Sequence, residues 1–215
     1  MLRPPCREKP ASGVLYLHGF NSGVDSPKAV WVREACAHLS LACETPQLPH
    51  RPAEALAMAE SRLAELGPAP LLAGSSMGGF LATCLAERHG LRAALINPAV
   101  APARLVSDWV DEVFVNATTG ERFTVGPTHL AELAALTPTR LTAPERYLLL
   151  LGTADEVLDP ADAFAFYRGA RTLLHPEADH GFVALVGHLS ALLAHGGHAL
   201  PPAWRPRPHK EPDDS

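Results

Sequence analysis

The sequence predicts an α/β domain with a mostly parallel sheet of about six strands and helices on both faces. Three observations predict this fold class. Short apolar runs typical of buried strands alternate along the chain with segments of helical periodicity. The 215 residues are enough for one domain with a substantial core. Proline and glycine separate the periodic segments and do not form a low-complexity block.

Six segments are typical of buried strands because they are short, apolar and bounded by turn or polar residues. They are residues 13–19, 41–45, 69–74, 92–98, 145–152 and 171–176. If the strands are parallel, their carboxyl ends share one edge of the sheet, which is where α/β proteins bind ligands. Functional residues are therefore expected just after these segments.

Five segments have the apolar spacing of helices. They are residues 26–40, 52–68, 78–90, 160–170 and 182–197. The first begins with Ser26 as a predicted N-cap and Pro27 at the first helical position. The segment 78–90 is apolar on nearly every side, which indicates a helix buried at the centre of the protein.

A single domain is predicted over residues 1–198. Within it, residues 98–142 have no clear period, and so long a segment in a compact domain usually has a function or short elements of its own. We expect it to form a small cap over the end of the sheet. Residues 199–215 are rich in proline and charge, so we expect a disordered tail.

Charge and composition argue against several classes of protein. The formal net charge is -5 and no basic cluster is present, so nucleic acid is not an expected partner. The N-terminus lacks the apolar region of a signal peptide, and no run approaches the ~20 apolar residues of a membrane span. We therefore expect a cytoplasmic protein. Its cysteines, expected to be reduced, are Cys6, Cys36, Cys43 and Cys84.

The stretch "AGSSMGGF" places a candidate nucleophile where a strand meets a helix. Only Ser76 has glycine two residues before and two residues after it, at Gly74 and Gly78. This G-x-S-x-G spacing allows a sharp turn that exposes the hydroxyl, because glycine has no side chain to collide in the bend. The neighbouring Ser75 does not fit the pattern. The N–H of Met77, at the start of the helix, would be one oxyanion donor.

A nucleophilic serine needs a base, and His180 is the candidate. It lies in "EADHGF", between the last predicted strand and the final helix, at the same edge of the sheet as Ser76. The other histidines are placed by the pattern in loops or on helix surfaces and ends. Asp179 is too near His180 in sequence to approach its ring from behind.

The acid that orients this base is expected to be Asp155, just past the fifth predicted strand. Its rivals are Glu156, which should point away from Asp155, and Asp159 and Asp162, which enter the next helix where acidic residues commonly cap. The order Ser, Asp, His along the chain is that of α/β-hydrolases.

A second oxyanion donor is expected from the loop after the first strand, "YLHGFNSGVDSPKA". The backbone N–H of Phe20 is the natural donor, and its side chain is incidental to that role. His18 stands at the exit of the strand. We expect it to order this loop through a hydrogen bond and to take no part in the chemistry.

The motifs "LYLHGFNSG", "GSSMGGF", "INPAV", "NATTGERF", "GTADEVLD" and "DHGF" occur in this order, and the chain resembles the small bacterial YqiA/YcfP-type esterases over about residues 13 to 195. The resemblance implies a three-layer α/β-hydrolase fold without the antiparallel N-terminal strands of larger relatives. It also implies a Ser-His-Asp esterase or thioesterase, with Ser76, Asp155 and His180 as its triad. The stretch "NSGVDSPKA" and the proline-rich tail depart from the family pattern.

These observations lead us to expect a serine esterase that prefers short acyl chains, forms an acyl-enzyme and needs no cofactor or metal. Its partner would be a small ester or thioester, and the sequence indicates no oligomeric state. A thioesterase with the same triad and a non-catalytic binding protein on a hydrolase fold are the alternatives. A metal site on His188, His195 and His198 is a third, although no nearby Cys, Asp or Glu completes it.

Overall fold

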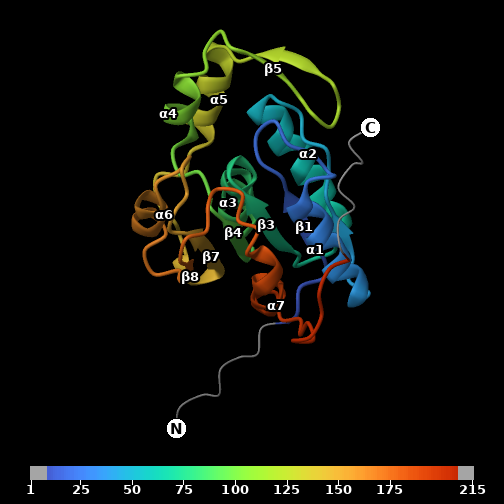
Figure 1. The fold of residues 1–215 in the computed structure, drawn as a ribbon. Helices are drawn as coiled ribbons and strands as arrows, with labels where there is room; N and C mark the ends of the chain where they lie inside the picture. Colours follow the sequence, from blue (N-terminus) through green and yellow to red (C-terminus); the bar gives the residue numbers. More distant parts are fainter. Residues whose placement is uncertain (1–8, 208–215) are drawn as a thin grey trace.

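The computed structural model describes residues 9–207 of the chain (Figure 1). Its main sheet has six strands in the order β2-β1-β3-β4-β7-β8, and every pairing between neighbouring strands is parallel. The prediction of a mostly parallel sheet of about six strands is confirmed. The strands are β1 (Val14–Leu17), β2 (Cys43–Glu44), β3 (Leu71–Ser75), β4 (Ala93–Ile96), β7 (Tyr147–Gly152) and β8 (Arg171–His175).

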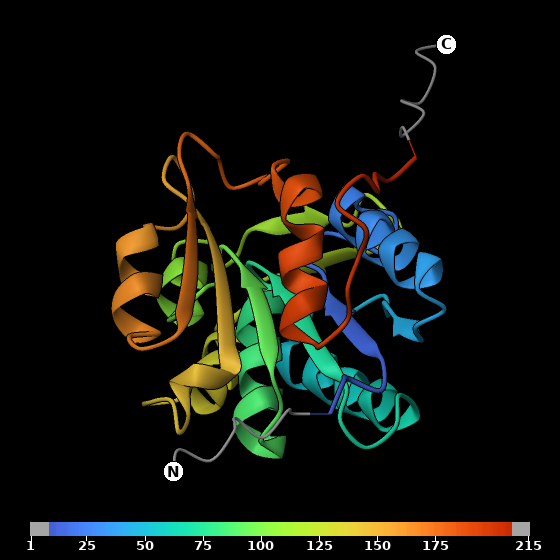
Figure 2. The same cartoon turned by 90° about the horizontal axis from the view of Figure 1, so that it is seen from below.

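Helices cover both faces of this sheet, as predicted (Figure 2). Because side chains alternate along a strand, Leu15 and Leu17 of β1 belong to the core on the side of α2, α3 and α6, whereas Val14 and Tyr16 belong to the core on the side of α1 and α7. Two cores, one on each side of the sheet, give the domain three layers. The helices are α1 (Pro27–His38), α2 (Pro52–Glu65), α3 (Met77–His89), α6 (Pro160–Phe166) and α7 (Leu185–His195).

Three helix starts differ in how they are capped. Asp159 accepts a hydrogen bond from the N–H of Ala161 at 2.8 Å, so it caps α6 as the sequence indicated. Ser26 precedes α1 at the predicted position, but its hydroxyl makes no capping hydrogen bond. Helix α7 begins later than the predicted Phe182, because that residue has a φ of 47° and belongs to the preceding loop.

Helix α3 crosses the ends of β1 and β3 at very short range. A Cβ on Gly78 would lie 2.0 Å from the carbonyl oxygen of Leu17, and a Cβ on Gly74 would lie 2.3 Å from the carbonyl oxygen of Gly78. Both neighbouring atoms belong to the backbone and cannot rotate away. Glycine at these two positions is therefore what allows the chain to turn directly from strand to helix.

The segment 98–142, expected to form a cap, has short elements of its own and lies beyond one end of the sheet (Figure 1). Its buried residues Phe123, Val125 and Leu133 join the core on the α2 and α3 side. Val113 and Val115 of its hairpin are instead exposed, at 47% and 53%. The elements of this cap are α4 (Pro102–Ser107), β5 (Val113–Val115), β6 (Arg122–Thr124) and α5 (Pro127–Leu136), and the 3-10 turn η1 (Pro144–Arg146) follows.

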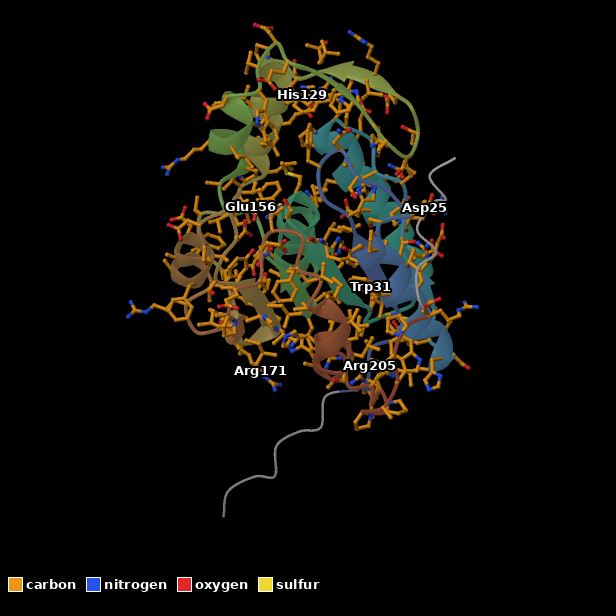
Figure 3. All side chains as sticks on the ribbon, in the orientation of Figure 1. Asp25, Trp31, His129, Glu156, Arg171 and Arg205 are labelled. Carbon is orange, nitrogen blue, oxygen red and sulfur yellow. The ribbon has the colours of Figure 1, made fainter. Side chains whose placement is uncertain are left out.

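Two histidines join the cap to the segment before α2. The N–H of Gly126 donates to Nδ1 of His129 at 3.1 Å, so His129 carries its proton on Nε2. That nitrogen donates to Nδ1 of His50 at 2.9 Å, and Nε2 of His50 then faces Glu121 at 3.8 Å. The chain of donors works only when both rings are neutral. His129 is marked at the cap in Figure 3.

Residues 199–207, expected to begin a disordered tail, pack against α1. Leu200 is buried, and Trp204 contacts the core on the α1 and α7 side. The guanidinium of Arg207 donates to the carboxylate of Glu34 at 2.9 Å. Apolar contacts and an ion pair thus hold this part of the segment. The remainder of the predicted tail, residues 208–215, lies outside the described residues.

Cys36, Cys43 and Cys84 are free thiols, and Cys36 and Cys84 are buried. Burial raises the pKa of the Cys84 thiol to about 12, which keeps it protonated and unreactive. Cys6 lies outside the described residues. Between residues 9 and 207, no helix is long and apolar enough to span a membrane.

We expect Gly78→Ala to destabilise the protein by about 3 kcal/mol or more, because the new methyl group would overlap the backbone of β1. Gly187→Ala is the matched control. Its Cβ would meet no atom within 4 Å, and alanine is the better helix former. Urea unfolding of the two variants measures the difference, and equal stabilities would show that the crossing is less tight than described.

We expect the cap to loosen in acid. Burial, followed by the charges of His50 and Arg51, lowers the pKa of His129, so folding favours the neutral ring. The stabilisation is therefore complete above about pH 6.5 and is lost as the pH falls below that value. Hydrogen exchange of residues 112–137, corrected for the intrinsic pH effect, should quicken between about pH 7.5 and pH 5.5. Peptides from α3 should not change, and a cap that exchanges equally at both pH values would contradict the expectation.

Candidate active site

The carboxyl ends of three parallel strands carry the residues that the sequence singled out. Ser76 follows β3 directly, Asp155 follows β7, and His180 follows β8. Ser76 has a φ of 55° and a ψ of -121°, which is a strained conformation for a residue with a side chain. Helix α3 begins at the next residue, Met77. The predicted turn between strand and helix is thus present at Ser76, whereas Ser75 is buried as the last residue of β3.

Four of the five predicted site residues line one cavity of about 560 Å³. They are Ser76, His180, Phe20 and Met77. Part of the lining is apolar and comes from the cap, from α1 and from the loops after β7 and β8. These apolar residues are Trp31, Leu105, Trp109, Val157 and Val183.

The fifth predicted residue, Asp155, stands behind His180. Nδ1 of His180 donates to the two carboxylate oxygens of Asp155 at 3.0 and 2.9 Å. The Asp155 side chain is 2% exposed, and one of its oxygens also accepts from the N–H groups of Val157 and Leu158 at 2.9 and 2.8 Å. The bond to Asp155 fixes the proton of His180 on Nδ1, so Nε2 has a free lone pair.

The hydrogen bonds also keep Asp155 ionised. Burial by itself raises the pKa of this carboxyl, but the hydrogen bonds from His180 and from the N–H groups of Leu158 and Val157 outweigh it, and the pKa is lowered. A carboxylate with a lowered pKa remains charged at neutral pH. It can therefore stabilise a positive charge on the imidazole.

Glu156 has a contact that the sequence did not indicate. Its carboxylate accepts the backbone N–H of His180 at 3.0 Å, so it holds the chain at His180 and not the ring. Glu156 is marked in Figure 3. Of the other two rivals of Asp155, Asp159 caps α6 and Asp162 lies in its first turn. Among the four acidic residues, the one bonded to the His180 ring is Asp155.

Asn97 is a further residue of the site that the sequence did not indicate, although it lies near the end of a predicted strand, in the "INPAV" motif. It is 3% exposed and has a φ of 41°. Its side-chain oxygen accepts the N–H of Gly152 at 2.8 Å, and its amide nitrogen donates to the carbonyl of Asp179 at 3.0 Å. Asn97 therefore joins the end of β4 to the end of β7 and to the loop that carries His180.

His18 orders the loop after β1, as predicted. The N–H of Leu48 donates to its Nε2 at 3.0 Å, so Nδ1 carries the proton and donates to the carbonyl of Gly19 at 2.9 Å. Burial lowers the pKa of His18 and favours this neutral form. The ordered loop adjoins Ser76, because a Cβ on Gly19 would lie 3.9 Å from Oγ of Ser76.

The side chain of Phe20 has a larger part than the sequence indicated. Its ring lies 5.1 Å from Trp109 in a stacked arrangement, and 5.1 and 5.7 Å from Phe114 and Phe123 in edge-to-face arrangements. All three partners belong to the cap. The residue whose N–H was predicted as an oxyanion donor therefore also forms an aromatic contact between the cap and the loop after β1.

The three histidines of the alternative metal site do not converge. Nε2 of His195 lies 2.9 Å from the carbonyl of Arg146, and Nε2 of His198 lies 2.8 Å from the carbonyl of Ala11. His188 instead packs beside the ring of His175. Over residues 9–207, no three His, Cys, Asp or Glu side chains form a group that could hold a metal ion.

Solved structures share the fold over most of their length at low sequence identity. Alpha/beta hydrolase domain-containing protein 10 from mouse is 18% identical, with a TM-score of 0.64 over 86% of this chain and 88% of that one. A monoacylglycerol lipase from Paleococcus ferrophilus is 17% identical, with a TM-score of 0.61 over 87% and 96%. The esterase domain of a Rhodothermus marinus protein is 18% identical, with a TM-score of 0.61 over 90% and 88%. The fold is that of the α/β-hydrolase superfamily.

A family model adds to this likeness of fold. It is described as "Uncharacterised protein family (UPF0227)", and it matches residues 13–196, which include all five predicted site residues. The matched range is close to the one over which the motifs resemble YqiA/YcfP-type proteins. The chain therefore belongs to the uncharacterised protein family UPF0227, which is the YqiA/YcfP family that its motifs predicted.

Proposed function

We propose that this protein is a serine hydrolase of carboxylic esters, with Ser76 as nucleophile, His180 as base and Asp155 as the acid that orients the base. The observation that carries the proposal is that Ser76 and His180 line the same cavity. Ser76 lies on a strained turn, and the ring of His180 is hydrogen-bonded to a buried carboxylate. A strained turn is retained where the surrounding structure enforces it, commonly at active sites.

The reaction would proceed in two acyl transfers. Oγ of Ser76 attacks the ester carbonyl carbon while its proton passes to Nε2 of His180, and Asp155 stabilises the resulting imidazolium. The carbonyl oxygen becomes an oxyanion held by the N–H groups of Phe20 and Met77. The imidazolium then protonates the departing alkoxide, which leaves as an alcohol. Water, deprotonated by His180, attacks the acyl-enzyme and releases the carboxylic acid and free Ser76.

The walls of the cavity favour a small apolar acyl group. Trp31, Trp109 and Leu105 are apolar side chains beside Ser76, and no Asp or Glu lines the cavity in the described part of the chain. Each buried methylene of a substrate gains about 0.8 kcal/mol until the available length is filled. Two of the similar structures are a lipase and an esterase domain by name, which agrees with ester hydrolysis.

We expect Ser76→Ala to abolish both labelling by a fluorophosphonate and hydrolysis of p-nitrophenyl esters, because the alanine has no nucleophilic oxygen. Ser75→Ala is the matched control, since Ser75 is the adjacent serine and lies at the end of β3. It should retain most of both activities. Full activity of Ser76→Ala would contradict the assignment, and absence of labelling in the unaltered protein would favour a non-catalytic binding protein.

We expect kcat/KM to rise over the first few acyl carbons and then to fall, with the best substrates at roughly two to eight carbons. A panel of esters and matched thioesters of increasing acyl length measures this preference and separates an esterase from a thioesterase. The cap is packed onto the domain, so micelle formation by the substrate should not raise the rate. A steady rise to long acyl chains, or a jump at the micellar concentration, would contradict the proposed pocket.

A further inference from the structure

Lys28, near the start of α1, contacts the loop that carries His180. It is the second residue of α1, and its ammonium donates to the carbonyl oxygen of Gly181 at 2.6 Å. Gly181 is the residue after His180, and Lys28, His180, Gly181 and Ser76 all line the cavity. The contact joins residues 153 positions apart in sequence. Lys28 is therefore placed to fix the loop relative to α1.

The Lys28 contact completes a series of attachments along the backbone of this loop. The N–H of Glu177 donates to the hydroxyl of Thr153 at 3.0 Å, and the carbonyl of Asp179 accepts from Asn97 at 3.0 Å. The N–H of His180 donates to Glu156 at 3.0 Å. These three attachments all lie at or before His180. The hydrogen bond from Lys28 holds the carbonyl of Gly181, immediately after His180. The backbone is therefore held on both sides of the His180 side chain.

The charges around Lys28 also show that it lies near Asp155, the proposed partner of His180. The carboxylates of Asp155 and Asp179 attract its ammonium, whereas burial, the larger effect, lowers the pKa of Lys28. Lys28 is the only Lys or Arg among the described residues that line the cavity. Charged groups around the His180 loop therefore include Asp155 and Glu156 from the loop after β7, Asp179 from the loop itself, and Lys28 from α1.

We propose that Lys28 is a positioning residue of the hydrolase. By binding the Gly181 carbonyl, it holds the His180 imidazole in position to accept the proton of Ser76. This inference rests on the proposed function, since a positioned imidazole matters only if it is the base. Catalysis is sensitive to such positioning, because a misplacement of about 1 Å in a catalytic group can cost on the order of 100-fold in rate.

The test compares Lys28→Met, Lys28→Arg and Arg104→Met with the unaltered protein. Met has a similar length but no donor and no charge, and Arg keeps both. Arg104 is exposed and outside the cavity, so its replacement removes one positive charge without touching the loop. Urea unfolding shows whether each variant folds. The measurements are kcat and KM on a neutral short-chain ester and hydrogen exchange of residues 177–183.

For Lys28→Met we expect kcat to fall about 10-fold or more while KM stays within about 2-fold, because positioning acts on the chemical step. Exchange of residues 177–183 should quicken. Lys28→Arg should restore most of both properties, and Arg104→Met should match the unaltered protein.

Several results would overturn the inference. Unchanged kcat and unchanged exchange in Lys28→Met would show that the contact with Gly181 does not hold the loop. A rise in KM with unchanged kcat would make Lys28 a substrate-binding residue instead. If the unaltered protein hydrolyses no ester, the proposed function fails. In that case, unchanged hydrogen exchange in Lys28→Met would also show that Lys28 does not hold the loop. Faster exchange would show that Lys28 holds the loop but has no role in catalysis.

Discussion

The close crossing of α3 over the ends of β1 and β3 is the constraint on which the rest of the site depends. Gly78 faces the Leu17 carbonyl and Gly74 faces Gly78, so no side chain separates these backbones. The turn between them forces Ser76 to a φ of 55°, a conformation that costs on the order of 1 to 3 kcal/mol. Parallel pairing of β3 with β1 and β4 supplies the framework that holds this strain.

Around this fixed point, the loops after the strands are held mainly by side chains that bind backbone groups. Asn97 joins the Gly152 N–H to the Asp179 carbonyl, and Glu156 binds the N–H of His180. Hydrogen bonds of this kind fix the course of a loop whatever rotamer its own side chains adopt. Within residues 9–207, the hydrogen bond to Asp155 is the contact that orients the ring of His180 itself. The position of the His180 loop and the orientation of the His180 ring are thus set by different residues.

Much of this arrangement could be predicted from the sequence because it follows from local patterns. The alternation of apolar runs and helical periods predicted the six strands, and the glycine spacing predicted the turn at Ser76. The contacts of Asn97 and Lys28 could not be predicted, because each joins segments far apart in sequence and neither residue type is unusual at its position. Ser26 occupies the predicted N-cap position of α1, but the absence of a hydrogen bond from its hydroxyl could not be predicted from the local pattern.

The cap differs from a mobile lid because one of its apolar contacts, Phe20, is part of the loop that would hold the oxyanion. Phe20 packs against Trp109, Phe114 and Phe123, and aromatic pairs contribute about 0.5 to 1.5 kcal/mol each beyond the area they bury. Opening the cap would separate these rings and release the loop at Phe20. Arg51 and Glu132 add an ion pair between the start of α2 and α5. A cap attached in this way would act as a fixed wall of the pocket, and its aromatic residues would then limit the size of the proposed substrate.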